Sequence, residues 1–175
     1  MTALKRYRIF PMMLLALCLA GCSNSQTAEA VAPFSALTWD SSPEDMNRLE
    51  KDATESYASV YNGTTYVYER EYQGRNGSLK YMFDDEDKLM CIAWAYEAAD
   101  AGELDRVYQS LHAEVEEACG ASGYNPSGST NYGDVWYRED GDIIISAVTA
   151  EDQYAIQYAY LNPLVSNQDA DHATR

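Results

Sequence analysis

Along residues 34–164, apolar positions recur with two different periods, and the change from one period to the other separates helices from strands. Residues 43 to about 53 carry apolar side chains at the i, i+3, i+7 spacing of a helix face, at Met46, Leu49 and Ala53. Ser42 and Pro43 precede them, a capping residue and a proline suited to the first turn. The pattern predicts a short amphipathic helix.

A second helix is predicted from 101 to 119. Asp100 stands three residues before Glu103, which is the spacing of a capping box, and Gly120 follows the last apolar position. The apolar face comprises Leu104, Val107, Tyr108, Leu111, Val115, Ala118 and Cys119. The opposite face carries Asp105, Arg106, Glu114, Glu116 and Glu117, and we expect it to contact solvent.

Shorter apolar segments predict strands at 57–60, 66–72, 79–83, 89–96, 135–137, 143–148 and 154–161. The turns expected between them are Asn62-Gly63, the run from 74 to 77, the acidic run from 84 to 87, and Asp140-Gly141. The strand at 89–96 is apolar on both faces, which indicates a position in the middle of the sheet.

These elements predict one α+β domain at 34–164, with two helices packed on one face of an antiparallel sheet of six or seven strands. Each half of the domain reads as a helix followed by three strands. The hairpin at 81–89 also resembles the hairpin at 135–143, 54 residues later. Two alternatives explain this likeness: a degenerate helix-plus-meander repeat, or the same turn chemistry in two unrelated hairpins.

One long segment without a helical or strand pattern, 120–133, is rich in glycine, serine and asparagine. Long irregular segments inside a domain are often functional. We therefore take it as a candidate binding loop, with Tyr124, Asn125 and Tyr132 as its contact residues.

The N-terminus has the profile of an export signal: three basic residues within the first eight, then an apolar run from Ile9 to Ala20. That run is too short for a membrane-spanning helix and contains Pro11. The segment Leu19-Ala20-Gly21-Cys22 resembles the lipobox of bacterial lipoprotein signals.

This resemblance implies that residues 1–21 are removed and that the Cys22 thiol carries a diacylglycerol. It also implies that the acyl chains hold the protein to a cell membrane, inner or outer, on the side facing away from the cytoplasm. The alternative is an ordinary secretory signal cut near Ala20. We expect 22–33 to be a flexible tether and 165–175 a disordered tail.

The composition limits the partners. The formal net charge is −16, and it becomes −19 without residues 1–21, which hold three basic and no acidic residues. Such a surface repels polyphosphate, so nucleic acid is excluded as a partner. Tyrosine is frequent, with 15 residues, which fits a sheet with one exposed face and also fits a contact surface.

Two cysteines remain after removal of Cys18 and lipidation of Cys22. They are Cys91, in a predicted strand, and Cys119, at the end of the second helix. In an exported protein a disulfide between them is one alternative, and two buried free thiols are the other.

The search for catalytic and metal-binding motifs finds no supported site. His112 and Glu116 share a helix face but recruit no third ligand, and the only other histidine is His172. The acidic turn at 84–87 lacks the ligand spacing of a calcium loop. No nucleophile elbow, phosphate loop or dinucleotide fingerprint occurs, so we expect neither a cofactor nor a metal.

Three features resemble the helix-on-sheet modules of small bacterial lipoproteins: Trp39, the capped helix start Ser42-Pro43-Glu44, and the hairpin at 81–89. The nearest groups are the β-lactamase-inhibitor-like domains and the small lipoprotein of the outer-membrane assembly machinery. The resemblance implies a non-catalytic module that binds a protein. The tyrosine excess and the long loop at 120–133 make the tyrosine face of the sheet and this loop the expected contact surfaces. The alternative function is carbohydrate or peptide binding by stacked Tyr and Trp rings, and an enzyme is the third hypothesis.

Overall fold

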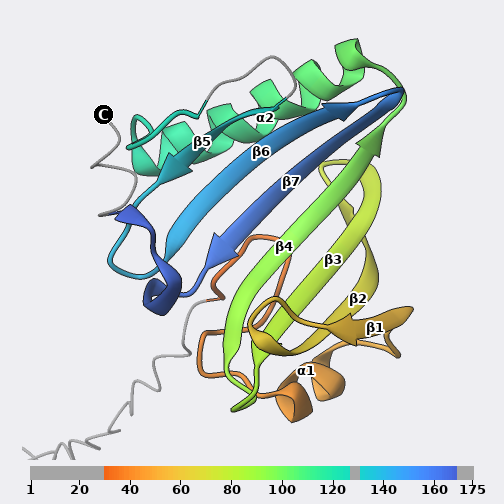
Figure 1. The fold of residues 1–175 in the computed structure, drawn as a ribbon, viewed down its shortest axis with the longest axis vertical. Coiled ribbons are helices and arrows are strands. Elements are labelled where there is room, and N and C mark those ends of the chain that lie inside the picture. Colours follow the sequence, from red (N-terminus) through yellow and green to blue (C-terminus); the bar gives the residue numbers. More distant parts are fainter. Residues whose placement is uncertain (1–29, 127–130, 169–175) are drawn as a thin grey trace, which may run out of the picture.

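The computed structural model describes residues 30–126 and 131–168. Its elements in chain order are α1 (Pro43–Leu49), β1 (Glu55–Ala58), β2 (Asn62–Tyr72), β3 (Arg75–Asp84), β4 (Leu89–Ala98), α2 (Ala101–Cys119), β5 (Asn131–Trp136), β6 (Asp142–Ala150), β7 (Gln153–Leu161) and the 3-10 turn η1 (Pro163–Val165). All strands form one antiparallel sheet in the order β1-β2-β3-β4-β7-β6-β5 (Figure 1).

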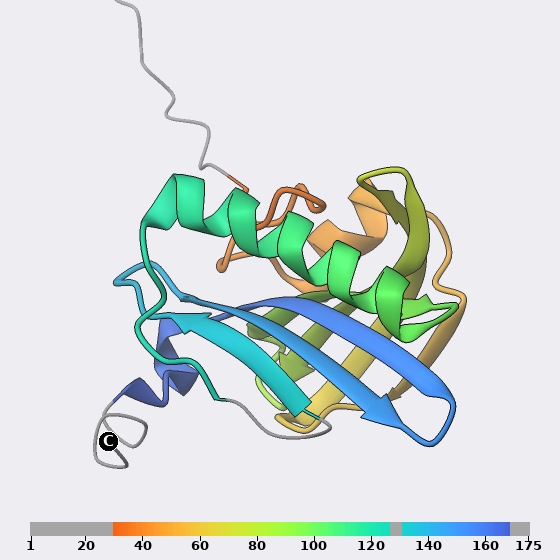
Figure 2. The same cartoon turned by 90° about the horizontal axis from the view of Figure 1, so that it is seen from above.

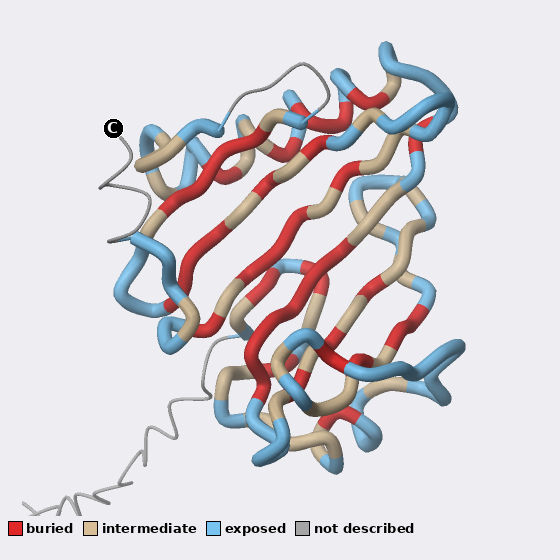
Figure 3. Tube along the Cα trace, in the orientation of Figure 1, coloured by how far each residue is buried: buried red, intermediate tan, exposed pale blue. Residues whose placement is uncertain are grey.

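The predicted α+β class is confirmed, with two helices and seven antiparallel strands among the described residues. Strand β4, the segment predicted to be central, lies in the middle of the sheet order. It is buried on both faces: Ile92 and Trp94 belong to the main core, and Cys91 and Ala93 belong to a second cluster covered by Tyr61, Met82 and Leu161. Figure 3 shows burial concentrated in the central strands, while β1 at one edge is exposed along its whole length.

Local signals set the helix ends. The Oγ of Ser42 accepts from the backbone N–H of Asp45, whose carboxylate accepts from the Ser42 N–H, so α1 begins with a capping box. Asp100 caps α2 by accepting from the Glu103 N–H, but the Glu103 carboxylate accepts from the Ala99 N–H, so the predicted capping box is formed only in part. However, α1 ends at Leu49, earlier than predicted, and this leucine is 54% exposed because no element covers it.

One turn lies earlier than the sequence indicates. The run from 74 to 77 was expected to be a turn, whereas the chain reverses at Gln73 and Gly74, both at positive φ. Gly77 belongs to β3, where it pairs with Arg70 of β2. A Cβ at Gly77 would lie 2.6 Å from the Trp94 indole nitrogen, so this glycine is kept for packing and not for the turn.

The helices and the segment 30–42 lie on the same side of the sheet (Figure 2). Helix α2 contacts β4, β6 and β7. The segment 30–42 inserts Phe34 among the rings of Tyr72, Tyr158 and Tyr160. The tyrosine-rich face of the sheet, predicted as a contact surface, is therefore the face that packs inside the domain.

The opposite face of the sheet carries small side chains. Cys91, Ala93 and Ala159 form a separate buried cluster there, packed against Tyr61 and Met82. Ser78, Ala95, Gln157, Ser146 and Gly133 form a continuous row across five strands of the sheet.

The packed structure begins before residue 34. Ala32, assigned by sequence to the tether, is 1% exposed, and the Val31 N–H donates to the Leu37 carbonyl. Residues 22–29 of the predicted tether lie outside the described residues. At the other end η1 and 166–168 are described, and the rest of the predicted tail is not.

The two halves meet at the β4–β7 pair, but α1 is followed by four strands and α2 by three, so β1 has no counterpart and only β2–β3–β4 can correspond to β5–β6–β7. In that arrangement the β3–β4 hairpin corresponds to β6–β7. The likeness at an offset of 54 instead aligns β3–β4 with β5–β6, so the matched hairpins do not occupy equivalent places. This placement favours shared turn chemistry over a repeat as the explanation of the likeness.

Candidate functional site

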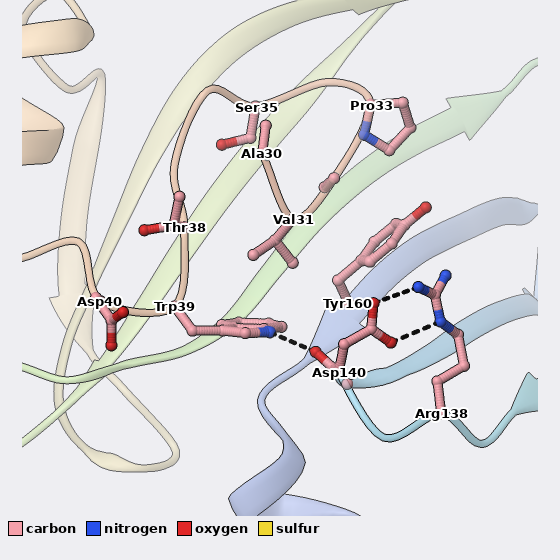
Figure 4. Close-up of a pocket in the computed structure, with 12 residues that line it drawn as sticks. Ala30, Val31, Pro33, Ser35, Thr38, Trp39, Asp40, Arg138, Asp140 and Tyr160 are labelled. Atoms are coloured by element: carbon pink, nitrogen blue, oxygen red, sulfur yellow. Dashed lines mark hydrogen bonds and ion pairs between the residues drawn. The ribbon is translucent and has the colours of Figure 1, made fainter. Parts of the chain in front are cut away.

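A cavity of about 640 Å³ lies between the N-terminal segment and the turn that joins β5 to β6 (Figure 4). One wall is the chain from 30 to 33 together with Thr38, Trp39 and Asp40. The facing wall is Arg138, Asp140 and Gly141, and Tyr160 of β7 also lines the cavity. The cavity thus joins two segments that are about a hundred residues apart.

Two contacts hold these walls together. The Trp39 indole N–H donates to the Asp140 carbonyl at 2.7 Å, and a Cβ at Gly141 would lie 3.0 Å from the Trp39 ring. Gly141 also has a φ of 130°, a conformation that side chains disfavour. The Trp39 ring therefore packs closely on a turn that only glycine completes without strain.

The charged groups of this cavity neutralise each other. The Arg138 guanidinium bonds to both carboxylate oxygens of Asp140, with its Nε 2.8 Å from Oδ1. This hydrogen bonding with Asp140 raises the pKa of Arg138. Asp40 is the exposed carboxylate of the opposite wall. The result is a half-open site with aromatic surface, a fixed ion pair and one exposed acid.

A smaller cavity of about 200 Å³ continues beneath the end of α2 and shares Pro33, Arg138 and Tyr160 with the first. Glu114 of α2 lines it and accepts hydrogen bonds from the Tyr72 hydroxyl at 2.5 Å and the Gln73 side chain at 2.6 Å. The sequence places Glu114 on the solvent face of α2. That prediction is wrong, because Glu114 turns toward these polar groups of the β2–β3 hairpin.

The phenols beside Glu114 are hydrogen-bond donors at neutral pH. Tyr158 and Tyr160 share a hydrogen bond of 2.8 Å. Burial raises the pKa of Tyr160 to about 12, and burial likewise raises the pKa of Tyr158 and Tyr72. The cluster can therefore orient polar groups, but its phenols do not titrate near pH 7.

The candidate loop residues make contacts inside the protein. The Tyr124 backbone pairs with Val135, and Asn125 donates to the Asp134 carboxylate at 2.7 Å. Tyr132 lies in β5, not in a loop, because β5 begins at Asn131, and its ring meets Tyr108 of α2 edge to face at 4.8 Å. Residues 127–130 of the loop lie outside the described residues.

Asp134 fixes this region. It is 2% exposed, and it accepts from Tyr108, from Asn125 and from the Ser122 hydroxyl at 2.6 Å. His112 Nε2 lies 3.4 Å from the same carboxylate. Ser122 and His112 both contact the Asp134 carboxylate. In a catalytic triad the serine hydroxyl would instead be hydrogen-bonded to the histidine. The arrangement anchors a loop to α2 and β5.

The two remaining cysteines are free thiols. Cys91 belongs to the cluster on the uncovered face of the sheet, and Cys119 lies on α2 over the other face, so the sheet separates them. The alternative of a Cys91–Cys119 disulfide is thus corrected to two free thiols. Burial raises the pKa of Cys91 to about 12, and Cys119 accepts a hydrogen bond from Arg138 at 3.4 Å.

Within the described ranges no group of three or more His, Cys, Asp or Glu side chains is arranged to hold a metal ion. His112 lies 3.7 Å from Glu116, as their helical spacing predicts. In the same part of the chain no helix combines the length and the apolar character needed to cross a membrane. Cys22 and His172 lie outside the described residues.

The comparisons with known proteins give no relative: neither a family model, nor a curated protein, nor a solved structure matches this chain.

Sequence reasoning found Trp39 but not the residues that it meets. Arg138, Asp140 and Tyr160 were assigned to a hairpin and a strand, with no sign that they face the N-terminal segment. The dipeptide Asp140-Gly141 was identified as a turn, which is confirmed. One signal was available in the sequence. Phe34, Leu37 and Trp39 are large apolar residues in a segment without a helix or strand pattern, so this segment has to pack against the rest of the domain.

Proposed function

We propose that this chain is a lipid-anchored, extracytoplasmic binding module without catalytic activity, and that its partner is a protein. The support for the anchor is the complete lipobox ending at Cys22, immediately after the apolar run. The acidic mature chain does not adsorb to anionic lipid headgroups, which fits a protein whose attachment to the membrane is the lipid on Cys22.

The observation that carries the binding role is the cavity between the N-terminal segment and the β5–β6 turn. It offers an aromatic ring at Trp39, a fixed ion pair and an open mouth, which suit recognition of a side chain or a short extended segment. Its Arg138–Asp140 pair is already satisfied internally, so the pair can orient a bound group.

The distance to the anchor supports the same role. Ala30, in the cavity wall, follows Cys22 by eight residues, a span of at most about 28 Å when fully extended. A lipid on Cys22 therefore keeps the cavity close to the membrane surface. We infer that the partner is a membrane protein or a protein held at the same surface.

The anchor is tested by labelling cells with a palmitate analogue. We expect the wild type to be labelled and to sediment with membranes, and Cys22→Ala to lose both properties. Equal labelling of the two proteins would contradict the anchor.

The binding site is tested by photo-crosslinking in intact cells. A crosslinking residue at Asp40, an exposed aspartate at the cavity, should join a discrete protein partner. The matched control is Asp105, an exposed aspartate on α2 away from the cavity. Trp39→Phe should reduce the Asp40 adduct, because it removes the hydrogen bond that holds the walls together. The same adducts from both positions would contradict this site.

The alternative is a carbohydrate ligand that stacks on Trp39 and Tyr160. The half-exposed indole in an open cavity favours it. A glycan array probed with wild type and Trp39→Ala distinguishes the two: glycan binding that depends on Trp39, together with no protein adduct, would replace the protein-binding proposal.

A further inference from the structure

The outer edge of β2 is paired with β1 for only part of its length. The pairing runs from Ala58–Thr64 to Glu55–Val67, and the Thr54 N–H also donates to the Val67 carbonyl. Strand β2 then continues for five more residues, to Tyr72. This last part of β2 pairs with β3 on one side only.

The backbone direction along this part of β2 follows from strand alternation. The Val67 carbonyl points to the outer edge, toward Thr54. Backbone groups of alternate residues point the same way, so those of Glu69 and Glu71 also face outward. The Arg70 carbonyl faces inward, where it accepts from the Trp94 indole at 3.0 Å. No backbone hydrogen bond to the outward groups of Glu69 or Glu71 occurs within the described residues.

A cavity of about 480 Å³ lies beside this edge, between residues 49–54 and residues 68–71. Two side-chain atoms among the residues that line it are buried without a hydrogen-bond partner: the Tyr68 hydroxyl and the Arg70 Nε. Tyr68 as a whole is 4% exposed. Buried polar atoms normally have partners, so the unpartnered hydroxyl of Tyr68, a residue that lines the cavity, is a hydrogen-bonding group left unused next to this edge.

The charge of this site selects its occupant. Glu50 and Arg70 form an ion pair of 2.6 Å and neutralise each other. Asp52, Glu69 and Glu71 remain, against Lys51 alone. A second copy of this chain would bring the same carboxylates together, which disfavours self-pairing along this edge. A basic segment meets the opposite charge.

We propose that the free edge of β2 from Tyr68 to Tyr72 docks an extended, lysine- or arginine-rich segment of a partner protein, which adds a strand to the sheet in line with β1. Glu69 and Glu71 supply outward backbone donors and acceptors, and the cavity receives a side chain of the added strand near the Tyr68 hydroxyl. The site is separate from the cavity at Trp39 and does not depend on lipidation of Cys22.

The test uses the full-length protein in detergent micelles and a capped hexapeptide of alternating lysine and threonine. We expect saturable binding, with amide resonance shifts confined to residues 49–54 and 68–71. A glutamate–threonine peptide of the same length should not bind. The same lysine peptide with every backbone nitrogen methylated should bind about tenfold more weakly, because it lacks the backbone donors of an added strand.

A pair of variants tests the protein side. Glu71→Pro removes an outward N–H that takes no part in the β2–β3 ladder, and Glu71→Gln keeps that N–H while removing the charge. We expect Glu71→Pro to weaken binding about tenfold and Glu71→Gln only about twofold.

Three results would overturn the proposal: no saturable binding of the lysine peptide, shifts centred elsewhere on the protein, or unchanged affinity of the N-methylated peptide. All three use the wild-type protein, so they hold even where Glu71→Pro fails to fold.

Discussion

Two different structures cover the two halves of the same sheet face. Over β4, β7 and β6 lies α2, a regular helix of 19 residues with a continuous apolar stripe. Over β2 and β3 lie the irregular segment 30–42, the short helix α1 and the connection to β1. The first cover is held mainly by apolar packing, and the second depends on polar contacts such as Tyr81 and Arg70 with Glu50.

This difference decides where binding sites are expected. The regular helix leaves a cavity of about 200 Å³ beneath its end, whereas the irregular cover borders larger spaces. Both the cavity at Trp39 and the cavity beside Glu69 border the irregular cover. The two buried side-chain atoms without a partner also lie under it. Both binding sites proposed above therefore border the irregular cover, and the half beneath α2 is the part expected to contribute most to stability.

The largest expected effect is unfolding at alkaline pH, which involves buried tyrosines under both covers of the sheet. Burial raises the pKa of Tyr160 to about 12, and it also raises the pKa of Tyr81 beneath the irregular cover and of Tyr108 beneath α2. Tyrosine in an unfolded chain titrates near about 10. The unfolded state therefore loses protons first, so the tyrosine contribution is complete below pH about 10 and is lost as the pH rises toward about 12.

The measurement is denaturant unfolding followed by circular dichroism as a function of pH, with tyrosinate absorbance recorded in parallel. Tyrosinate should form together with unfolding. Full ionisation of these tyrosines while the fold persists would show that they are not packed as described.

The next effect separates the two halves. Leu111→Ala on α2 removes a buried side chain and should lower the free energy of unfolding by about 2–5 kcal/mol. Leu49→Ala on α1 is the matched control, because this leucine is largely exposed, and it should change stability by less than about 0.5 kcal/mol. Urea unfolding measures both. Similar losses from the two substitutions would remove the distinction between the covers.

A smaller effect tests the polar cover. Glu50→Ala removes the acceptor of Tyr81 and the partner of Arg70, and should cost about 1–3 kcal/mol. Arg70 is partly exposed, so solvent limits this cost. Glu117→Ala, an exposed glutamate on α2, is the control and should be neutral. Hydrogen exchange should accelerate in residues 34–42 of Glu50→Ala, and unchanged exchange there would contradict the role of Glu50.

The sequence predicted those parts of the fold whose signals are local. Helix α2 was predicted because the Asp100 cap, the apolar period and Gly120 agree within one segment. The β2–β3 turn was misplaced because Gly77 serves the Trp94 ring of another strand, and no local pattern shows that. Tyr132 was assigned to a loop for the same reason: the strand around it forms through pairing with β6.

The candidate site was predicted least well, since its contacts join distant segments. Trp39 was noted as an apolar residue, but its partner Asp140 lies a hundred residues away. Glu114 was assigned to solvent from helical periodicity alone, although its partners Tyr72 and Gln73 lie on another element. The cysteine alternatives were settled by the side of the sheet that each thiol occupies, which depends on strand pairing and helix packing together.

The most direct test of the central claim is mass spectrometry of the N-terminal peptide from the processed protein isolated with membranes. The account predicts that the chain begins at Cys22 and that this residue carries acyl chains. An unmodified Cys22 in a processed protein recovered free of membranes would contradict it.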